Sequence, residues 1–117
     1  MNKKEITING KQYQVAFDLQ TMLNFEQNVG RSFFTIDFNN LSLDNRINLI
    51  HAAVKSADEN TPLTVDEIKG KRKFDDLNSI LAASNTIVML SLEFLQIPDV
   101  EKEQEQEQQE GDKQPKN

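Results

Sequence analysis

Apolar and polar residues alternate over the first 17 residues of the chain. The alternation runs on both sides of Asn9-Gly10, a pair that favours a two-residue type I′ turn because both residues accept positive φ angles. Such a turn sets Ile6 opposite Tyr13 and sorts the apolar side chains onto one face and the polar ones onto the other. We therefore expect a β-hairpin over residues 4–17, with an apolar face made by Ile6, Ile8, Tyr13 and Val15.

After the hairpin the apolar residues recur at helical spacing, and the helix boundaries carry capping signals. Asp18, Ser42 and Thr64 are typical N-cap residues, and glycine or proline follows the ends of the helical stretches. These signals predict four helices, over about residues 19–29, 43–57, 65–69 and 72–96. The expected apolar stripe is Leu19, Met22, Leu23 and Val29 in the first helix, with Phe25 at its edge, and Leu43, Ile47, Ile50, Val54 and Ala57 in the second.

The last predicted helix is apolar nearly all round in its second half, which is typical of a helix that is buried on more than one side. Its main stripe is predicted to be Phe74, Leu77, Ile80, Leu81, Ser84, Ile87, Val88, Ser91, Phe94 and Leu95. Met89, Leu90 and Leu92 lie off that stripe, and a monomer seldom leaves such a group in water unless it serves binding. We predict that these three residues form a partner-binding surface.

An aromatic-rich segment, residues 31–40, separates the first two long helices. It contains Phe33, Phe34 and Phe38. Core packing is the more usual fate of phenylalanine, and a binding patch is the alternative. Phe33 and Phe34 are therefore kept as further candidate partner-binding residues.

Charge divides the chain into two parts. The whole chain of 117 residues has a net charge of −6, and residues 99–117 carry seven acids and three lysines, a net of −4, which leaves −2 for residues 1–98. The Glu/Gln-rich stretch has no apolar stripe to dock, so we expect a single folded domain over 1–98 and a disordered acidic tail over 99–117. The expected fold class is α+β and mainly helical, with the hairpin packed on a bundle of about three to four helices.

Composition and motifs give no support for an enzyme, a metal site or a cofactor site. The chain has no cysteine, no G-x-S-x-G turn and no phosphate-binding pair of glycines. His51, the single histidine, has no second ligand or nucleophile near it in sequence, and the acids at 58–67 lack the central glycine of a calcium loop. We therefore expect no catalytic residue, no metal and no cofactor.

The same features indicate where the protein works and which partners it lacks. The short basic cluster at 69–73 is followed directly by two aspartates, so nucleic acid is not expected as a partner. There is no secretory signal, and the apolar run at 87–95 is too short to span a bilayer. We expect a soluble, cytoplasmic protein that does not enter a membrane.

Several segments, in order, resemble the small tail assembly chaperones of long-tailed bacteriophages. They are the Ile-Thr-Ile-Asn-Gly-Lys-x-Tyr hairpin at 6–13, Phe-Glu-x-x-x-Gly-x-Ser-Phe-Phe at 25–34, Ala-Ala-Val-Lys at 52–55 and Leu-Thr-x-Asp-Glu-Ile at 63–68. The resemblance implies a non-enzymatic protein in the host bacterium that binds the tape measure protein and keeps it soluble while tail tube subunits assemble. The alternative is a self-associating structural or adaptor component of a tail, or an unrelated oligomeric domain.

Overall fold

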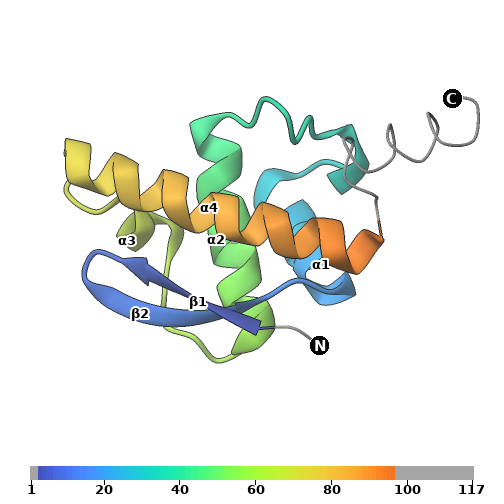
Figure 1. Cartoon of the computed structure of the whole chain (residues 1–117), viewed down its shortest axis with the longest axis horizontal. Coiled ribbons are helices and arrows are strands. Elements are labelled where there is room, and N and C mark those ends of the chain that lie inside the picture. The colour runs from blue at the N-terminus through green and yellow to red at the C-terminus, as the bar shows by residue number, and fades with distance from the viewer. Residues whose placement is uncertain (1–2, 97–117) are drawn as a thin grey trace, which may run out of the picture.

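A computed structural model describes residues 3–96 of the chain (Figure 1). The predicted Glu/Gln-rich tail, residues 99–117, lies outside the described residues. The expected architecture is confirmed: an N-terminal two-stranded antiparallel hairpin packs on helices. The elements in chain order are β1 (Lys3–Ile8), β2 (Lys11–Ala16), α1 (Leu19–Val29), the 3-10 turn η1 (Phe33–Thr35), α2 (Leu43–Ala57), α3 (Val65–Lys69) and α4 (Phe74–Leu95).

The hairpin has the predicted register and turn. Ile6 lies opposite Tyr13 and Ile8 opposite Lys11, and Asn9 and Gly10 both have positive φ angles, 53° and 83°. Ile6, Ile8 and Val15 are buried and Tyr13 is half-buried, so the apolar face packs on the helices as expected. The turn is also bonded to the helices, because Asn9 Nδ2 donates to the backbone oxygen of Glu67 in α3 (2.6 Å).

The Gly10 position gives a direct test of the turn. A Cβ at Gly10 would meet nothing within 4 Å, so Gly10→Val adds no clash and acts through the positive φ alone. We expect a loss of roughly 1–2 kcal/mol and a melting temperature lower by about 5–10 °C. Gly10→Asn is the control, because asparagine tolerates positive φ. A Val variant that melts with the wild type would show that this turn conformation is not required.

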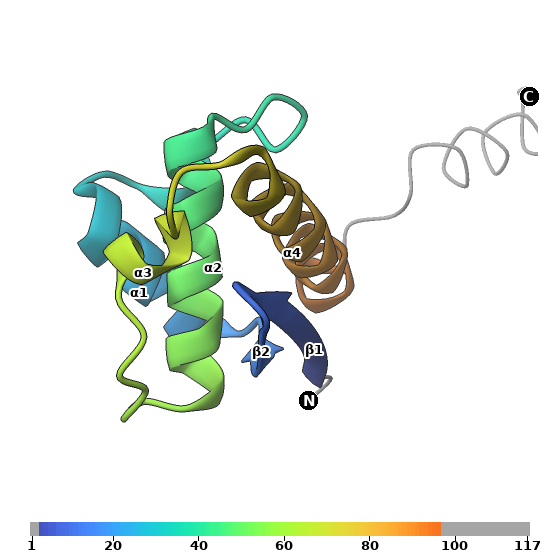
Figure 2. The same ribbon diagram turned by 90° about the vertical axis from the view of Figure 1, so that its left-hand side faces the viewer.

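Helix α2 is the centre of the domain. Its side chains are buried around most of its circumference, because α1 and α3 lie on one side of it and α4 and the hairpin on the other (Figure 2). Ile47, Ile50 and Val54 are buried as predicted, but Leu43, at the first position of the helix, is exposed. The buried residues also include Asn45, Asn48, Leu49, Ala52 and Ala53.

The predicted apolar stripe of α1 is wrong in part. Met22 is buried, but Leu19 and Leu23 are exposed and Phe25, expected at the edge of the stripe, is fully buried. Polar contacts with α2 set this rotation, because the amides of Asn24 and Asn28 donate to the backbone oxygens of Ala52 (3.2 Å) and Asn48 (3.3 Å). Hydrophobic periodicity alone does not predict such hydrogen bonds between side chains and the backbone.

Helix α4 begins at Phe74, two residues later than predicted. Arg72 has a positive φ of 61°, which breaks the helical conformation. The carboxylate of Asp76 accepts hydrogen bonds from the backbone nitrogens of Lys71 and Lys73, both at 2.9 Å, and so fixes the turn that leads into the helix. This turn between α3 and α4 forms one border of the candidate binding site.

Candidate protein-binding groove

The predicted surface on the second half of α4 is not a contiguous patch. Leu90 is 3% exposed and belongs to the core, so its assignment to an exposed binding surface is wrong. Leu92 is half-buried. Met89 is 61% exposed but stands between Asn85 and Glu93 on the polar side of the helix. A single exposed apolar residue of this kind is common on any protein surface.

The two candidate aromatic residues of η1 have opposite environments. Phe33 is 2% exposed, and its ring contacts those of Phe17, Phe25 and Phe38 at centroid distances of 5.1–5.9 Å. Phe34 is 75% exposed and touches Phe33 edge-on. Phe33 is thus the centre of a core cluster, whereas Phe34 remains available to a partner.

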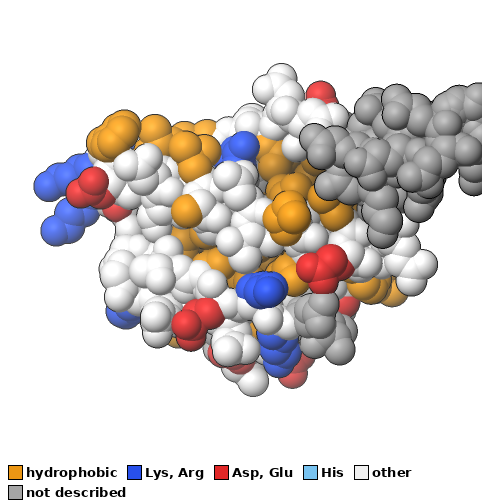
Figure 3. All heavy atoms as spheres, in the orientation of Figure 1, with side chains coloured by type: hydrophobic (Ala, Val, Ile, Leu, Met, Phe, Trp, Pro, Cys, Tyr) orange, Lys and Arg blue, Asp and Glu red, His pale blue; other side chains and the backbone are white. Residues whose placement is uncertain are grey.

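An apolar hollow lies elsewhere, in the angle between the first turns of α2 and the first half of α4. It has a volume of about 540 Å³, within the range of roughly 300–1,000 Å³ found for binding pockets. In Figure 3, apolar side chains gather over this first half of α4, with basic and acidic side chains together at its end. We call it the α2–α4 groove; its apolar residues are Leu43, Ile47, Phe74, Leu77 and Ile80.

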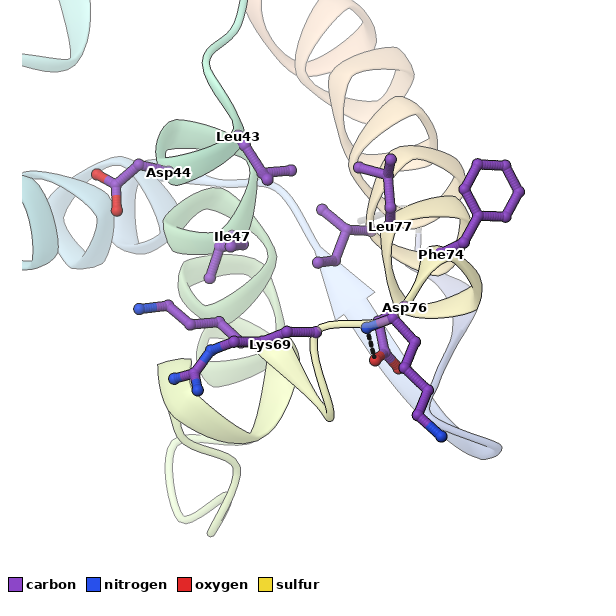
Figure 4. A pocket seen from close by; sticks show the side chains of 10 residues that line it. Leu43, Asp44, Ile47, Lys69, Phe74, Asp76 and Leu77 are labelled. Atoms are coloured by element: carbon purple, nitrogen blue, oxygen red, sulfur yellow. Dashed lines mark hydrogen bonds between the residues drawn. The ribbon is translucent and has the colours of Figure 1, made fainter.

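The two helices line the groove from both walls, and the ring of Phe74 turns outward at its border, on the side of α4 away from α2 (Figure 4). Leu43 of α2 and Leu77 of α4 point toward one another, and Lys69 lies across the end next to α3 (Figure 4). Phe74 is 72% exposed and Leu43 47% exposed, although both are large apolar residues. The groove is therefore an open apolar surface on which a ligand can bury side chains.

Arg46 holds the two walls together. Its guanidinium nitrogen Nη1 donates to Ser84 Oγ (2.7 Å) and to Asn85 Oδ1 (3.0 Å), and so joins α2 to the middle of α4. Charge-assisted hydrogen bonds of this kind are about twice as strong as neutral ones. These two bonds join the walls of the groove in addition to the direct packing of α2 on α4.

The border of the groove is basic. Lys69, Arg72 and Lys73 line it on the α3 side, whereas its two acids are turned elsewhere. Asp76 faces the backbone N–H groups of the turn before α4, and Asp44 points away from the groove in Figure 4. An apolar floor with cationic borders is suited to an amphipathic ligand.

Within residues 3–96 no three His, Cys, Asp or Glu side chains come together in a way that would hold a metal ion. His51 Nδ1 lies 3.0 Å from the amide nitrogen of Asn28, which can only donate, so the contact requires an unprotonated Nδ1. Burial, and then the charge of Lys55, lower the pKa of His51, so the histidine is a neutral structural link between α1 and α2 near pH 7.

This environment of His51 predicts a pH dependence of stability. Because the folded-state pKa lies below the unfolded value of about 6.5, the unfolded chain binds more protons as the pH falls through this range. The free energy of unfolding should therefore fall as the pH is lowered from 7.5 toward 5.5. His51→Gln should flatten this part of the curve in urea titrations; equal slopes for variant and wild type would contradict the assignment.

The groove is not predicted from the sequence, although its apolar residues all appear in the predicted stripes of the helices. Hydrophobic periodicity assigns all five apolar groove residues to core stripes, because a period of 3.6 marks an apolar face without saying what covers it. The available signal is the length of the stripes. Leu43 and Phe74 are the first residues of their helices, where a small domain has few other elements left to cover them.

Helix α4 also has the length and composition of a membrane-spanning helix. Among the described residues it is the one helix that meets this criterion. The criterion is met by the whole helix of 22 residues, whereas the apolar run at 87–95 alone is too short to span a bilayer. Core helices of soluble proteins meet the same criterion. Here α4 packs against β1, α2 and α3, and Ile80, Ile87 and Leu90 are buried in that contact.

Comparisons of the chain with family models, with curated proteins and with solved structures find no match. The geometry of the α2–α4 groove is therefore the structural observation that bears on the function of the chain.

Proposed function

We propose that this protein is a non-enzymatic, cytoplasmic tail assembly chaperone of a phage or prophage, and that it binds the tape measure protein through the α2–α4 groove. The observation that carries the proposal is the open apolar groove, whose walls are fixed by Arg46 and whose floor offers no chemistry other than apolar contact. A chaperone for a long, helical, apolar protein needs such a surface and no reactive group.

The residues behind the resemblance have structural roles that fit a small scaffold. Glu26 accepts a hydrogen bond from the backbone nitrogen of Phe33 (2.8 Å), and Gly30 ends α1 with a φ of 75°. Thr64 and Glu67 form the capping box that begins α3. These residues shape the turns that join the helices, and the groove is the surface that the scaffold leaves open for a partner.

Coexpression tests the proposal. The tape measure protein from the same phage or prophage is expected to accumulate in the insoluble fraction alone, and to stay soluble and coelute with this protein when both are made in one cell. Two results would contradict the proposal. One is a tape measure protein that never coelutes; the other is a chain that forms large homo-oligomers and ignores the tape measure protein, which would favour a structural tail component.

A further inference from the structure

The floor of the α2–α4 groove restricts the backbone conformation of its occupant. The side chains of Leu43, Ile47, Leu77 and Ile80 offer no hydrogen-bond donor or acceptor. An extended peptide lying on them would bury unpaired N–H and C=O groups, which is costly. An α-helix satisfies its own backbone, and a groove between two helices is a known mode of binding an amphipathic helix.

The border of the groove restricts the charge of that helix. Within residues 3–96 the one ion pair is Lys69 with Asp66, at 4.0 Å, so the charged ends of Arg72 and Lys73 have no carboxylate partner there. Asp76 is committed to backbone N–H groups. Asp44, the other acid of the lining, points away from the groove in Figure 4. The charges that face the groove are therefore mainly positive, although residues 1–98 as a whole carry a net charge of −2.

The backbone conformation of Arg72 is a second observation at this border of the groove. Its φ of +61° is a conformation that glycine adopts freely and that is uncommon for other residues. Glycine would relieve this strain. Arginine instead keeps a guanidinium at the border of the groove, and strain of this kind concentrates at functional surfaces.

We infer that the α2–α4 groove binds an amphipathic helix of a partner protein whose apolar stripe is bordered by Asp or Glu, which pair with Arg72 and Lys73. The inference deepens the proposed function and rests on its protein-binding part. Arginine can hold a carboxylate through two parallel hydrogen bonds, so the pairing also fixes the register of the helix along the groove.

Two synthetic helical peptides and the full chain provide the test. The peptides share one leucine stripe at i, i+3, i+4 and i+7, and differ in having Glu or Lys along its borders. We expect fluorescence anisotropy to give at least tenfold tighter binding of the Glu peptide at 50 mM salt, and a smaller difference at 300 mM, because exposed charges are screened.

A charge-reversed border should invert this preference. Arg72→Asp combined with Lys73→Glu is suitable, because aspartate tolerates the positive φ at 72 and a Glu before α4 favours its N-terminus. The matched control is Lys3→Glu with Lys4→Glu, which makes the same change in net charge on exposed residues of β1 outside the groove. The control should keep the wild-type preference for the Glu peptide.

The outcomes separate this inference from the proposed function. Equal affinity for both peptides, binding of neither, or an unchanged preference in the border variant would overturn the inference. A dimer that forms without peptide and that the border variant dissociates would assign the groove to a second copy, and would overturn it too. If the border variant captures the tape measure protein as the wild type does, the proposed chaperone role is supported, and the inference that the groove binds a helix with acidic borders is contradicted. A Glu preference without capture of the tape measure protein would support the acidic helix and contradict the chaperone role.

Discussion

Phe33→Ala should lower the free energy of unfolding by about 3–5 kcal/mol, the usual cost of removing a buried phenylalanine. The ring of Phe33 is fully buried and joins the residue after β2, α1 and the 36–42 loop through its contacts with Phe17, Phe25 and Phe38. Truncation leaves a cavity where three elements meet. Since small domains are stabilised by only about 5–15 kcal/mol, the variant should melt far below the wild type.

Phe34→Ala is the matched control for this change. The neighbouring ring is exposed and touches only Phe33 among the described aromatic rings, edge-on at 5.6 Å. Such a pair contributes about 0.5–1.5 kcal/mol at most, so the control should melt close to the wild type. Urea titrations of both variants measure the difference. Similar losses for the two positions would contradict the division into a core ring and a surface ring.

The sequence is sufficient to predict the hairpin and the helix positions, because the signals that set them are local. The turn at Asn9-Gly10 fixes the register of the strands, and each of the caps Asp18, Ser42 and Thr64 accepts a hydrogen bond from the first turn of its helix. The boundary that is displaced by two residues, the start of α4, depends on the carboxylate of Asp76, which accepts hydrogen bonds from two backbone nitrogens before the helix.

The faces of the helices are predicted less well, because burial depends on which elements meet in three dimensions. Periodicity puts Leu90 on the surface, but α4 crosses the domain so that this side of the helix is buried. It puts Leu43 and Phe74 in the core, but both are exposed, and no other element of the described structure covers them. A stripe that is too long for its small domain is thus the feature of the sequence that indicates the groove.

The second large effect is expected on binding. Leu43→Glu combined with Phe74→Glu should weaken capture of the tape measure protein at least a hundredfold, or about 2.7 kcal/mol. Burial of each side chain against a partner is worth about 1.5–3 kcal/mol, and both substitutions place a charge in the apolar contact. The fold should persist, because both residues are exposed and occupy the first position of a helix, where Glu is favourable.

A control with the same chemistry exists on α1. Leu19 is also the first residue of its helix, and Leu19 and Leu23 are exposed apolar residues outside the groove. Leu19→Glu with Leu23→Glu therefore removes two apolar side chains and adds two charges, as the groove variant does. Circular dichroism and melting curves should be near wild type for both double variants.

Binding through the groove is tested most sharply by the amount of tape measure protein that coelutes with each double variant after coexpression, relative to wild type. We expect the α1 variant to retain the tape measure protein in wild-type amounts, while the groove variant, folded, retains almost none. Equal retention by the two folded variants would contradict the assignment of binding to the α2–α4 groove.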